Sequence, residues 1–196
     1  MSSVVTLPYL GTRSYLHGTT VFETLAPDLV GASDITLRLP QLISSDRVLI
    51  EAIDPDDPKK GHAFAIWRSD QGWMGRRLTA LPPSAEPARA PYDEQAIIRC
   101  ASVSDTRVWF HTRPQTTFLK AAIVANKALL TGYLKPPQDG GQWLFTQLEL
   151  ESLPPADASF ELRYRSRFSL AAVKTEILFA NGARGAIQFA WRTVRR

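Results

Sequence analysis

TRSYLH, at residues 12–17, returns as TRVWFH at residues 106–111, with the same Thr-Arg pair, an aromatic residue inside and the same closing histidine. Each phrase stands just before an apolar segment with the spacing of a helix. Recurrence of a motif in the same local context is the signature of an internal repeat. The pair of phrases therefore predicts two copies of one structural unit.

Two further matches follow in the same order in both halves. Residues 35–53 (ITLRLPQLISSDRVLIEAI) align with 160–178 (FELRYRSRFSLAAVKTEIL), and residues 61–68 (GHAFAIWR) align with 185–192 (GAIQFAWR). Coincidence is the alternative explanation, but the apolar pattern agrees together with the letters. Residues 82–95, rich in Pro and Ala, are typical of a linker. The predicted organisation is a first repeat at 1–81, a linker at 82–95 and a second repeat at 96–196.

Each copy predicts a strand, then a helix, then a run of antiparallel strands, which is an α+β architecture. Aromatic-rich stretches at 14–17 and 108–111 favour the first strand of each copy. Apolar residues from Phe118 to Tyr133 recur at helical spacing, and a shorter helix at 19–30 is interrupted by Pro27. The later strands are expected at 35–39, 47–53, 62–68 and 72–81, and at 160–164, 173–180 and 185–192. An insertion at 135–156 is expected to be a loop with an added strand.

This order resembles the hotdog fold, in which a sheet wraps around one long helix. The stretches DITLRLPQLISSDRVLIEA and SFELRYRSRFSLAAVKTEI resemble the second and third strands of that family. Ser45-Asp46, and less closely Leu170-Ala171, take the place of the turn between them. The resemblance implies two hotdog-like halves whose sheets join in a pseudo-dimer, a double hotdog.

The resemblance also implies a chemistry, because hotdog proteins typically act on acyl groups carried as thioesters on coenzyme A or acyl carrier protein. Dehydratases of the family use a His with a carboxylate, and thioesterases use a carboxylate, often on the helix. The residues implied for catalysis are His17 as the base, with Glu23 or His111 assisting. Coenzyme A or phosphopantetheine is then the substrate carrier, no separate cofactor or metal is expected, and the acyl chain is expected in an apolar pocket between the halves.

Two alternatives remain open. The segment 115–134 contains lysines but no acid, and the HFPG-like phrase of the dehydratases is absent, which favours a non-catalytic binding or assembly module. A duplicated βαβββ metalloenzyme of the glyoxalase/dioxygenase type would instead use His17, Glu51, His111 and Glu176 as ligands of a divalent metal.

Composition excludes several other classes of protein. A single cysteine, Cys100, excludes an internal disulfide framework, and the formal net charge is only +4. No apolar run reaches the roughly 20 residues of a membrane span, and no signal peptide is expected, so a cytoplasmic protein is predicted. The Arg-rich stretch 162–168 could meet phosphates, but a nucleic-acid partner is not expected. The chain is expected to be a monomer or a homodimer.

Overall fold

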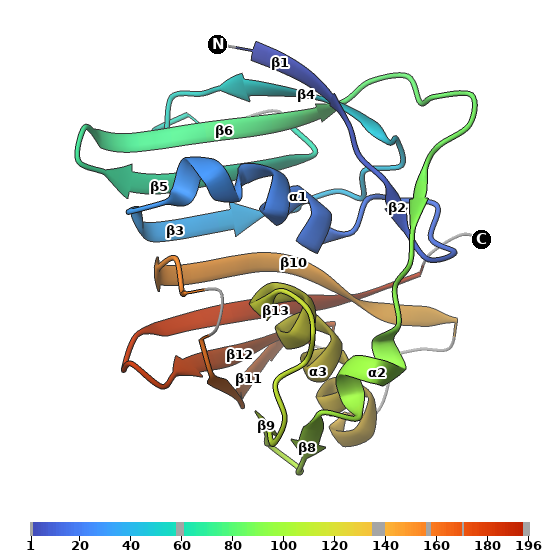
Figure 1. Cartoon of the computed structure of the whole chain (residues 1–196), viewed down its shortest axis with the longest axis vertical. Coiled ribbons are helices and arrows are strands. Elements are labelled where there is room, and N and C mark those ends of the chain that lie inside the picture. Colours follow the sequence, from blue (N-terminus) through green and yellow to red (C-terminus); the bar gives the residue numbers. More distant parts are fainter. Residues whose placement is uncertain (1, 58–60, 135–139, 156–157, 170, 194–196) are drawn as a thin grey trace. The chain divides into compact units, whose positions relative to one another are not determined.

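The computed structural model describes residues 2–57, 61–134, 140–155, 158–169 and 171–193 (Figure 1). Part of the predicted insertion at 135–156 and Leu170 of the predicted turn lie outside the described residues. The chain divides into two compact units. Unit 1 comprises residues 1–92 and 149–153, and unit 2 comprises residues 93–148 and 154–196.

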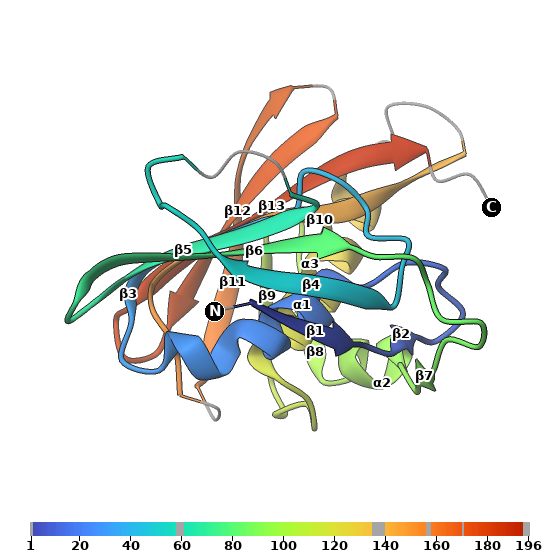
Figure 2. The same ribbon diagram turned by 90° about the horizontal axis from the view of Figure 1, so that it is seen from above.

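Unit 1 places one short helix against an antiparallel sheet (Figure 2). Its elements are β1 (Ser2–Thr6), α1 (Gly18–Leu25), the 3-10 helix η1 (Ala26–Leu29), β3 (Ser33–Arg38), β4 (Arg47–Ala52), β5 (Ala63–Ser69) and β6 (Gly72–Ala80). The strand order is β1-β4-β6-β5-β3, and each strand runs antiparallel to its neighbour. A separate parallel pair joins β2 (Tyr9–Leu10) to β7 (Arg89–Ala90).

Unit 2 has a longer helix and longer strands. Its elements are α2 (Glu94–Ile98), β8 (Ala101–Val103), β9 (Arg107–Phe110), α3 (Phe118–Tyr133), β10 (Gly141–Ser152), β11 (Phe160–Ser169), β12 (Ala172–Phe179) and β13 (Arg184–Thr193). The last residues of β10, from 149 onward, belong to unit 1. The strand order is β10-β13-β12-β11-β9-β8.

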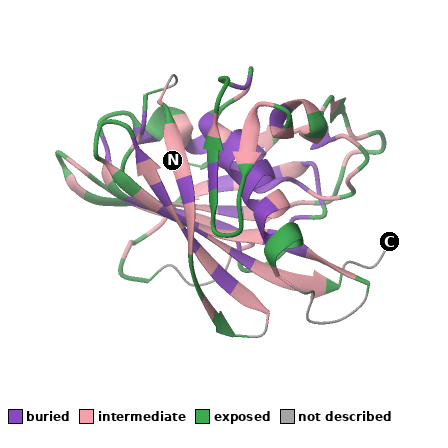
Figure 3. Ribbon diagram, turned by 90° about the horizontal axis from the view of Figure 1, so that it is seen from below, coloured by how far each residue is buried: buried purple, intermediate pink, exposed green. Residues whose placement is uncertain are grey.

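The core of each unit lies between its helix and its sheet. Alternate residues of the strands are buried, as in β12, where Val173, Thr175, Ile177 and Phe179 are buried and the residues between them are half-buried. Figure 3 shows the buried positions in purple along the helices and at alternating places on the strands. This period-2 burial is what a sheet with one covered face requires.

Several predicted elements are confirmed. The helix predicted over 115–134 is observed as α3, Phe118–Tyr133, with Thr117 as its N-cap. Leu25 ends α1 and the chain continues as a 3-10 turn that contains Pro27, because a proline ring is tolerated only near the start of a helical segment. The strand predicted at 108–111 is observed as β9.

The strand predicted at 14–17 is wrong. Ser14 and Tyr15 form a bend, and Leu16 donates its N–H to Ile43 O at 2.8 Å instead of to a sheet neighbour. The first strand of unit 1 is β1, a polar edge strand whose sequence SSVVT has little apolar periodicity. Leu16 and His17 are buried while Ser14 is exposed, so this stretch is a partly buried loop and not a strand.

Strand positions do not follow the letter match between 35–53 and 160–178. Residues 35–38 lie in β3, the first strand after α1, whereas residues 160–163 lie in β11, the second strand after α3. The first strand after α3 is β10, in the segment predicted as an insertion. The units also differ in order, because β6 lies between β4 and β5 while β12 lies between β11 and β13.

The Ser45-Asp46 step between β3 and β4 is a buried polar turn. Asp46 is fully buried, and its Oδ1 accepts the backbone N–H of Ser84 at 2.8 Å. Ser45 Oγ accepts the backbone N–H of Arg47 at 3.1 Å. Hydrogen bonds from Ser84 hold the pKa of Asp46 below its ordinary value of 3.8.

Acidification should therefore destabilise unit 1 through Asp46. Because the folded-state pKa is lowered, the ionised carboxylate stabilises the fold above pH 3.8 and this stabilisation is lost as the pH falls through the folded-state pKa. Asp46→Asn should flatten the dependence of the melting temperature on pH in the acid range. The measurement is thermal unfolding from about pH 7 to about pH 3. Asp105→Asn, at an exposed turn, removes the same charge as a control, and equal acid sensitivity of D46N and wild type would contradict the assignment.

Candidate active site at the start of helix α1

His17 stands at the junction where the loop ends and α1 begins. It is the N-cap residue, with φ −76° and ψ 142°, and its carbonyl accepts the N–H of Val21 at 3.2 Å. The N–H groups of the first turn of a helix have no partner within the helix and carry its positive dipole end. A histidine at this position therefore lies next to donors that can stabilise a developing oxyanion.

The imidazole of His17 is buried, with a hydroxyl and an aromatic ring among its neighbours. Its Nδ1 lies 2.9 Å from Thr19 Oγ1, and its ring centroid lies 5.3 Å from that of Tyr92. The guanidinium of Arg13 stands over the same Tyr92 ring at 4.8 Å, a cation–π contact. Sequence reasoning found His17 but missed Thr19 and Tyr92. Thr19 was recognisable as a hydroxyl two residues away, whereas Tyr92 lies in the predicted linker and gives no local signal.

Glu23 lies on a different side of α1 from His17. Successive helical residues are rotated by about 100°, so six residues separate two side chains by about 240°. Glu23 is half-buried, and the hydrogen bond described for the His17 side chain is to a hydroxyl. Helix geometry therefore separates the predicted base from the predicted acid.

His111 belongs to unit 2, directly after β9. It is exposed, its Nδ1 lies 3.4 Å from Ser102 Oγ, and its backbone N–H is donated to Cys100 O at 3.1 Å. Its described side-chain neighbour is thus a hydroxyl, as for His17. Its setting differs in exposure, since the His17 side chain is enclosed and the His111 side chain meets solvent.

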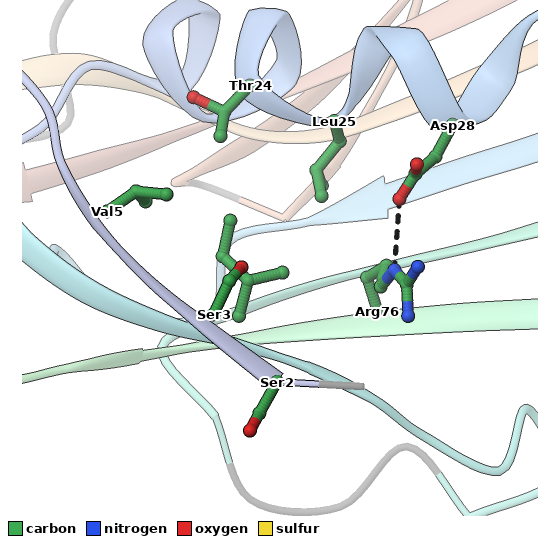
Figure 4. Close-up of a pocket in the computed structure, with 8 residues that line it drawn as sticks. Ser2, Ser3, Val5, Thr24, Leu25, Asp28 and Arg76 are labelled. Carbon is green, nitrogen blue, oxygen red and sulfur yellow. Dashed lines mark hydrogen bonds and ion pairs between the residues drawn. The ribbon is translucent and has the colours of Figure 1, made fainter.

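An open pocket of about 320 Å³ lies at the other end of α1 (Figure 4). Val5, Leu25 and Ile50 line its apolar part, and an ion pair of 2.9 Å between Arg76 and Asp28 lines one side. The remaining lining residues carry hydroxyls: Ser2, Ser3 and Thr24. Since α1 has eight residues, the pocket and His17 are separated by most of the helix, about 12 Å. The acyl pocket expected between the halves stays a prediction.

Carboxylates of the predicted metal set bind arginines. Glu51 pairs with Arg77 at 3.0 Å in unit 1, and Glu176 pairs with Arg165 in unit 2. Within the described part of the chain, no group of three or more His, Cys, Asp or Glu side chains could hold a metal ion. The metalloenzyme interpretation therefore has no site among these residues.

The Arg-rich strand β11 is similarly occupied by acidic partners. Arg163 donates to both carboxylate oxygens of Glu161, at 2.9 and 3.1 Å, and this contact lowers the pKa of Glu161. Arg107 lies 3.8 Å from the same carboxylate. Part of the positive charge of this face is thus neutralised within unit 2.

Comparison with known proteins finds similar folds among solved structures. No family model and no curated protein matches the chain. The dehydratase domain of PpsC from Mycobacterium tuberculosis, solved in complex with C12:1-CoA, superposes with a TM-score of 0.53 at 11% identity, over 97% of this chain and 93% of that one. A conserved protein of unknown function with a hot dog fold, from Alicyclobacillus acidocaldarius, gives a TM-score of 0.50 at 11% identity over 100% and 93%. The chain has the hotdog fold.

A third similar structure comes from Thermobifida fusca YX and is provisionally described as a thioesterase II. Its TM-score is 0.52 at 16% identity, over 99% of this chain and 92% of that one. At identities this low the structural similarity shows the hotdog fold alone. The reaction has to be inferred from the residues of the site. Among the described residues of this hotdog protein, no helix is long and apolar enough to cross a bilayer.

Proposed function

We propose that this hotdog protein binds acyl thioesters of coenzyme A or acyl carrier protein and acts on them as a dehydratase or a thioesterase, with His17 as the base. The observation that carries the proposal is the buried imidazole at the N-cap of α1, beside the Thr19 hydroxyl. The similar structures add support, since one is a dehydratase domain solved in complex with C12:1-CoA and another is provisionally described as a thioesterase II.

Both reactions give His17 the same task. In dehydration the imidazole takes the α-proton, and the hydroxyl leaves as water with a proton from a second acidic group. In hydrolysis the imidazole takes a proton from water as that water attacks the thioester carbonyl, and the imidazolium returns the proton to the departing thiolate as the C–S bond breaks. In either case negative charge develops on the carbonyl oxygen, which the N–H groups at the start of α1 can stabilise.

We further propose that the two units are the halves of a double hotdog. Each has a helix followed in the chain by four strands of a sheet, namely β3 to β6 in unit 1 and β10 to β13 in unit 2. A duplicated gene would produce this arrangement, with the second histidine phrase giving His111. The chain is then a monomer or a homodimer that carries two candidate sites.

The direct test is a panel of acyl-CoAs of increasing chain length. A ligand present at about 100 times its Kd stabilises the folded state by about 2.7 kcal/mol, which a thermal shift assay detects. Release of free thiol reports hydrolysis, and loss of water from a hydroxyacyl-CoA reports dehydration. Absence of stabilisation by CoA and by every acyl-CoA would overturn the proposal.

A non-catalytic acyl-thioester binding module is the second candidate. Two observations favour it. The side chains of His17 and Glu23 lie on different sides of α1, and the sequence of α3 contains no Asp or Glu. Stabilisation by an acyl-CoA without thiol release or water loss would assign this function.

A further inference from the structure

The helix-covered face of the unit 1 sheet carries a cation, Arg76. It lies in β6 opposite Ala52 of β4 and Ala65 of β5, and Leu78, two residues further along the same face, is fully buried. The Arg76 side chain is only 25% exposed. Since β6 has a strand on each side, this charge does not protect an open sheet edge. Partial burial of a charge on an apolar face is unfavourable unless the charge has a partner.

Asp28 of η1 is a partner for only part of this guanidinium. Its Oδ2 accepts the Nε–H of Arg76 at 2.9 Å, and the Asp28 side chain is 42% exposed. A guanidinium has five N–H donors, four of them on its two Nη atoms. The Nη donors of Arg76 have no acceptor among the described residues. Arg76 can therefore hold a second anion while it stays in contact with Asp28.

The open pocket of about 320 Å³ lies beside this ion pair (Figure 4). Leu25, at the end of α1, and Ile50 of β4 give it a buried apolar surface. Ser3 stands opposite Ile50 in the β1–β4 ladder and lines the same pocket. Because α1 ends after eight residues, it leaves the β1 edge of the sheet open, and four of the five residues of β1 are exposed.

The lining selects for charge, for shape and for size. A guanidinium matches the two oxygens of a carboxylate through parallel N–H donors. Asp28 would repel a dianion, so a single negative charge is favoured. Val5, Leu25 and Ile50 require an apolar body next to the charged group. The volume is at the low end of the roughly 300–1,000 Å³ of small-molecule sites, so that body is short.

We propose that this pocket binds a short-chain monocarboxylate, with its carboxylate on the Nη donors of Arg76 and its hydrocarbon chain against Val5, Leu25 and Ile50. The pocket lies at the end of α1 opposite to His17. The site is therefore separate from the proposed acyl-thioester chemistry and does not depend on it.

Three ligands separate the contributions of charge and apolar body. Hexanoate has both, hexanamide lacks the charge, and acetate lacks the apolar body. Each is titrated into the full-length protein, labelled with nitrogen-15, and followed by two-dimensional NMR. Hexanoate should shift the amide resonances of β1, β4 and the end of α1. Hexanamide and acetate should bind at least about tenfold more weakly.

Two charge variants should change hexanoate binding in opposite directions. Arg76→Gln should weaken it by about tenfold to a hundredfold, the usual effect of losing hydrogen bonds to a charged group. Asp28→Asn should strengthen it by up to about fivefold, because the competing carboxylate is removed. Arg68→Gln is the matched control, since this exposed residue of β5 carries the same charge outside the pocket and its loss should leave binding unchanged.

Ser3→Phe tests the cavity without a change of charge. The side chain lies on the exposed edge strand, where a larger residue is tolerated, and the ring should fill the pocket and block hexanoate. This variant decides the question even if Arg76→Gln fails to fold.

Equal binding of hexanoate and hexanamide would overturn the proposal, as would wild-type hexanoate binding in Ser3→Phe or in folded Arg76→Gln. Absence of any resonance shift with hexanoate would also overturn it and would assign the Arg76–Asp28 pair to the stability of the fold alone. None of these outcomes involves an acyl thioester, so the proposed function is tested separately.

Discussion

His17→Ala should lower kcat/KM for an acyl thioester by about 10²–10⁴-fold, the usual contribution of a positioned acid–base group. The imidazole is buried at the N-cap of α1, with Thr19 Oγ1 2.9 Å from Nδ1, so it is held in one place relative to the first helical turn. Alanine removes the base and leaves the backbone donors of that turn. The measurement is steady-state kinetics with the best acyl-CoA substrate.

Loss of fold must be separated from loss of the base. His17→Asn keeps a residue type that favours the N-cap and should fold, but should show the same loss of turnover. His62→Ala is the matched control in the same unit, because His62 Nδ1 accepts a backbone N–H from Ala80 at 3.3 Å and has no assigned chemistry. Wild-type turnover in both His17 variants would eliminate His17 as the base.

Phe189→Ala should lower the free energy of unfolding by about 3–5 kcal/mol. Phe189 is among the largest fully buried side chains, stands opposite Val173 in the β12–β13 ladder and lies 6.0 Å from the ring of Phe145. Truncation removes its transfer free energy and leaves a cavity that rigid strands on both sides prevent from closing. Denaturant titration followed by fluorescence measures the change.

Phe168→Ala provides the comparison, since Phe168 in β11 is 58% exposed. The same truncation there should change stability by less than about 0.5 kcal/mol. Similar effects of F189A and F168A would show that the described packing of unit 2 is incorrect.

The elements that sequence predicts well are those whose apolar residues repeat with a clear period. Residues 118–133 form one helix because a regular apolar stripe continues for four turns, and 172–179 form a strand because buried and half-buried residues alternate. The stretch 14–17 lacks such a period. Its conformation depends on a long-range hydrogen bond, which the N–H of Leu16 donates to Ile43 O. The added strand expected within 135–156 is observed as β10, but the sequence match paired 160–178 with 35–53, whose strands hold different places in the order after the helix.

The candidate site was predictable only in its local part. His17 precedes a helix in the sequence, so its N-cap position follows from neighbouring residues. Tyr92 reaches the same imidazole from 75 positions further along the chain, and no local pattern encodes that contact.

The pairing of β2 with β7 changes where unit 1 can be cut. The Pro- and Ala-rich composition at 82–95 is typical of a flexible linker, which proteases would cleave and which could be removed without loss of the fold. Instead Gly11 donates its N–H to Ala90 O at 2.9 Å, and Arg89 donates to the carbonyls of Gly11 and Arg13, both at 2.9 Å. The segment is therefore hydrogen-bonded to the loop that leads to His17 and is not a free linker. Truncation of unit 1 after Leu81 would remove the segment that contains β7 and Tyr92. The loop that leads to His17 would then lose the hydrogen bonds that hold it in place.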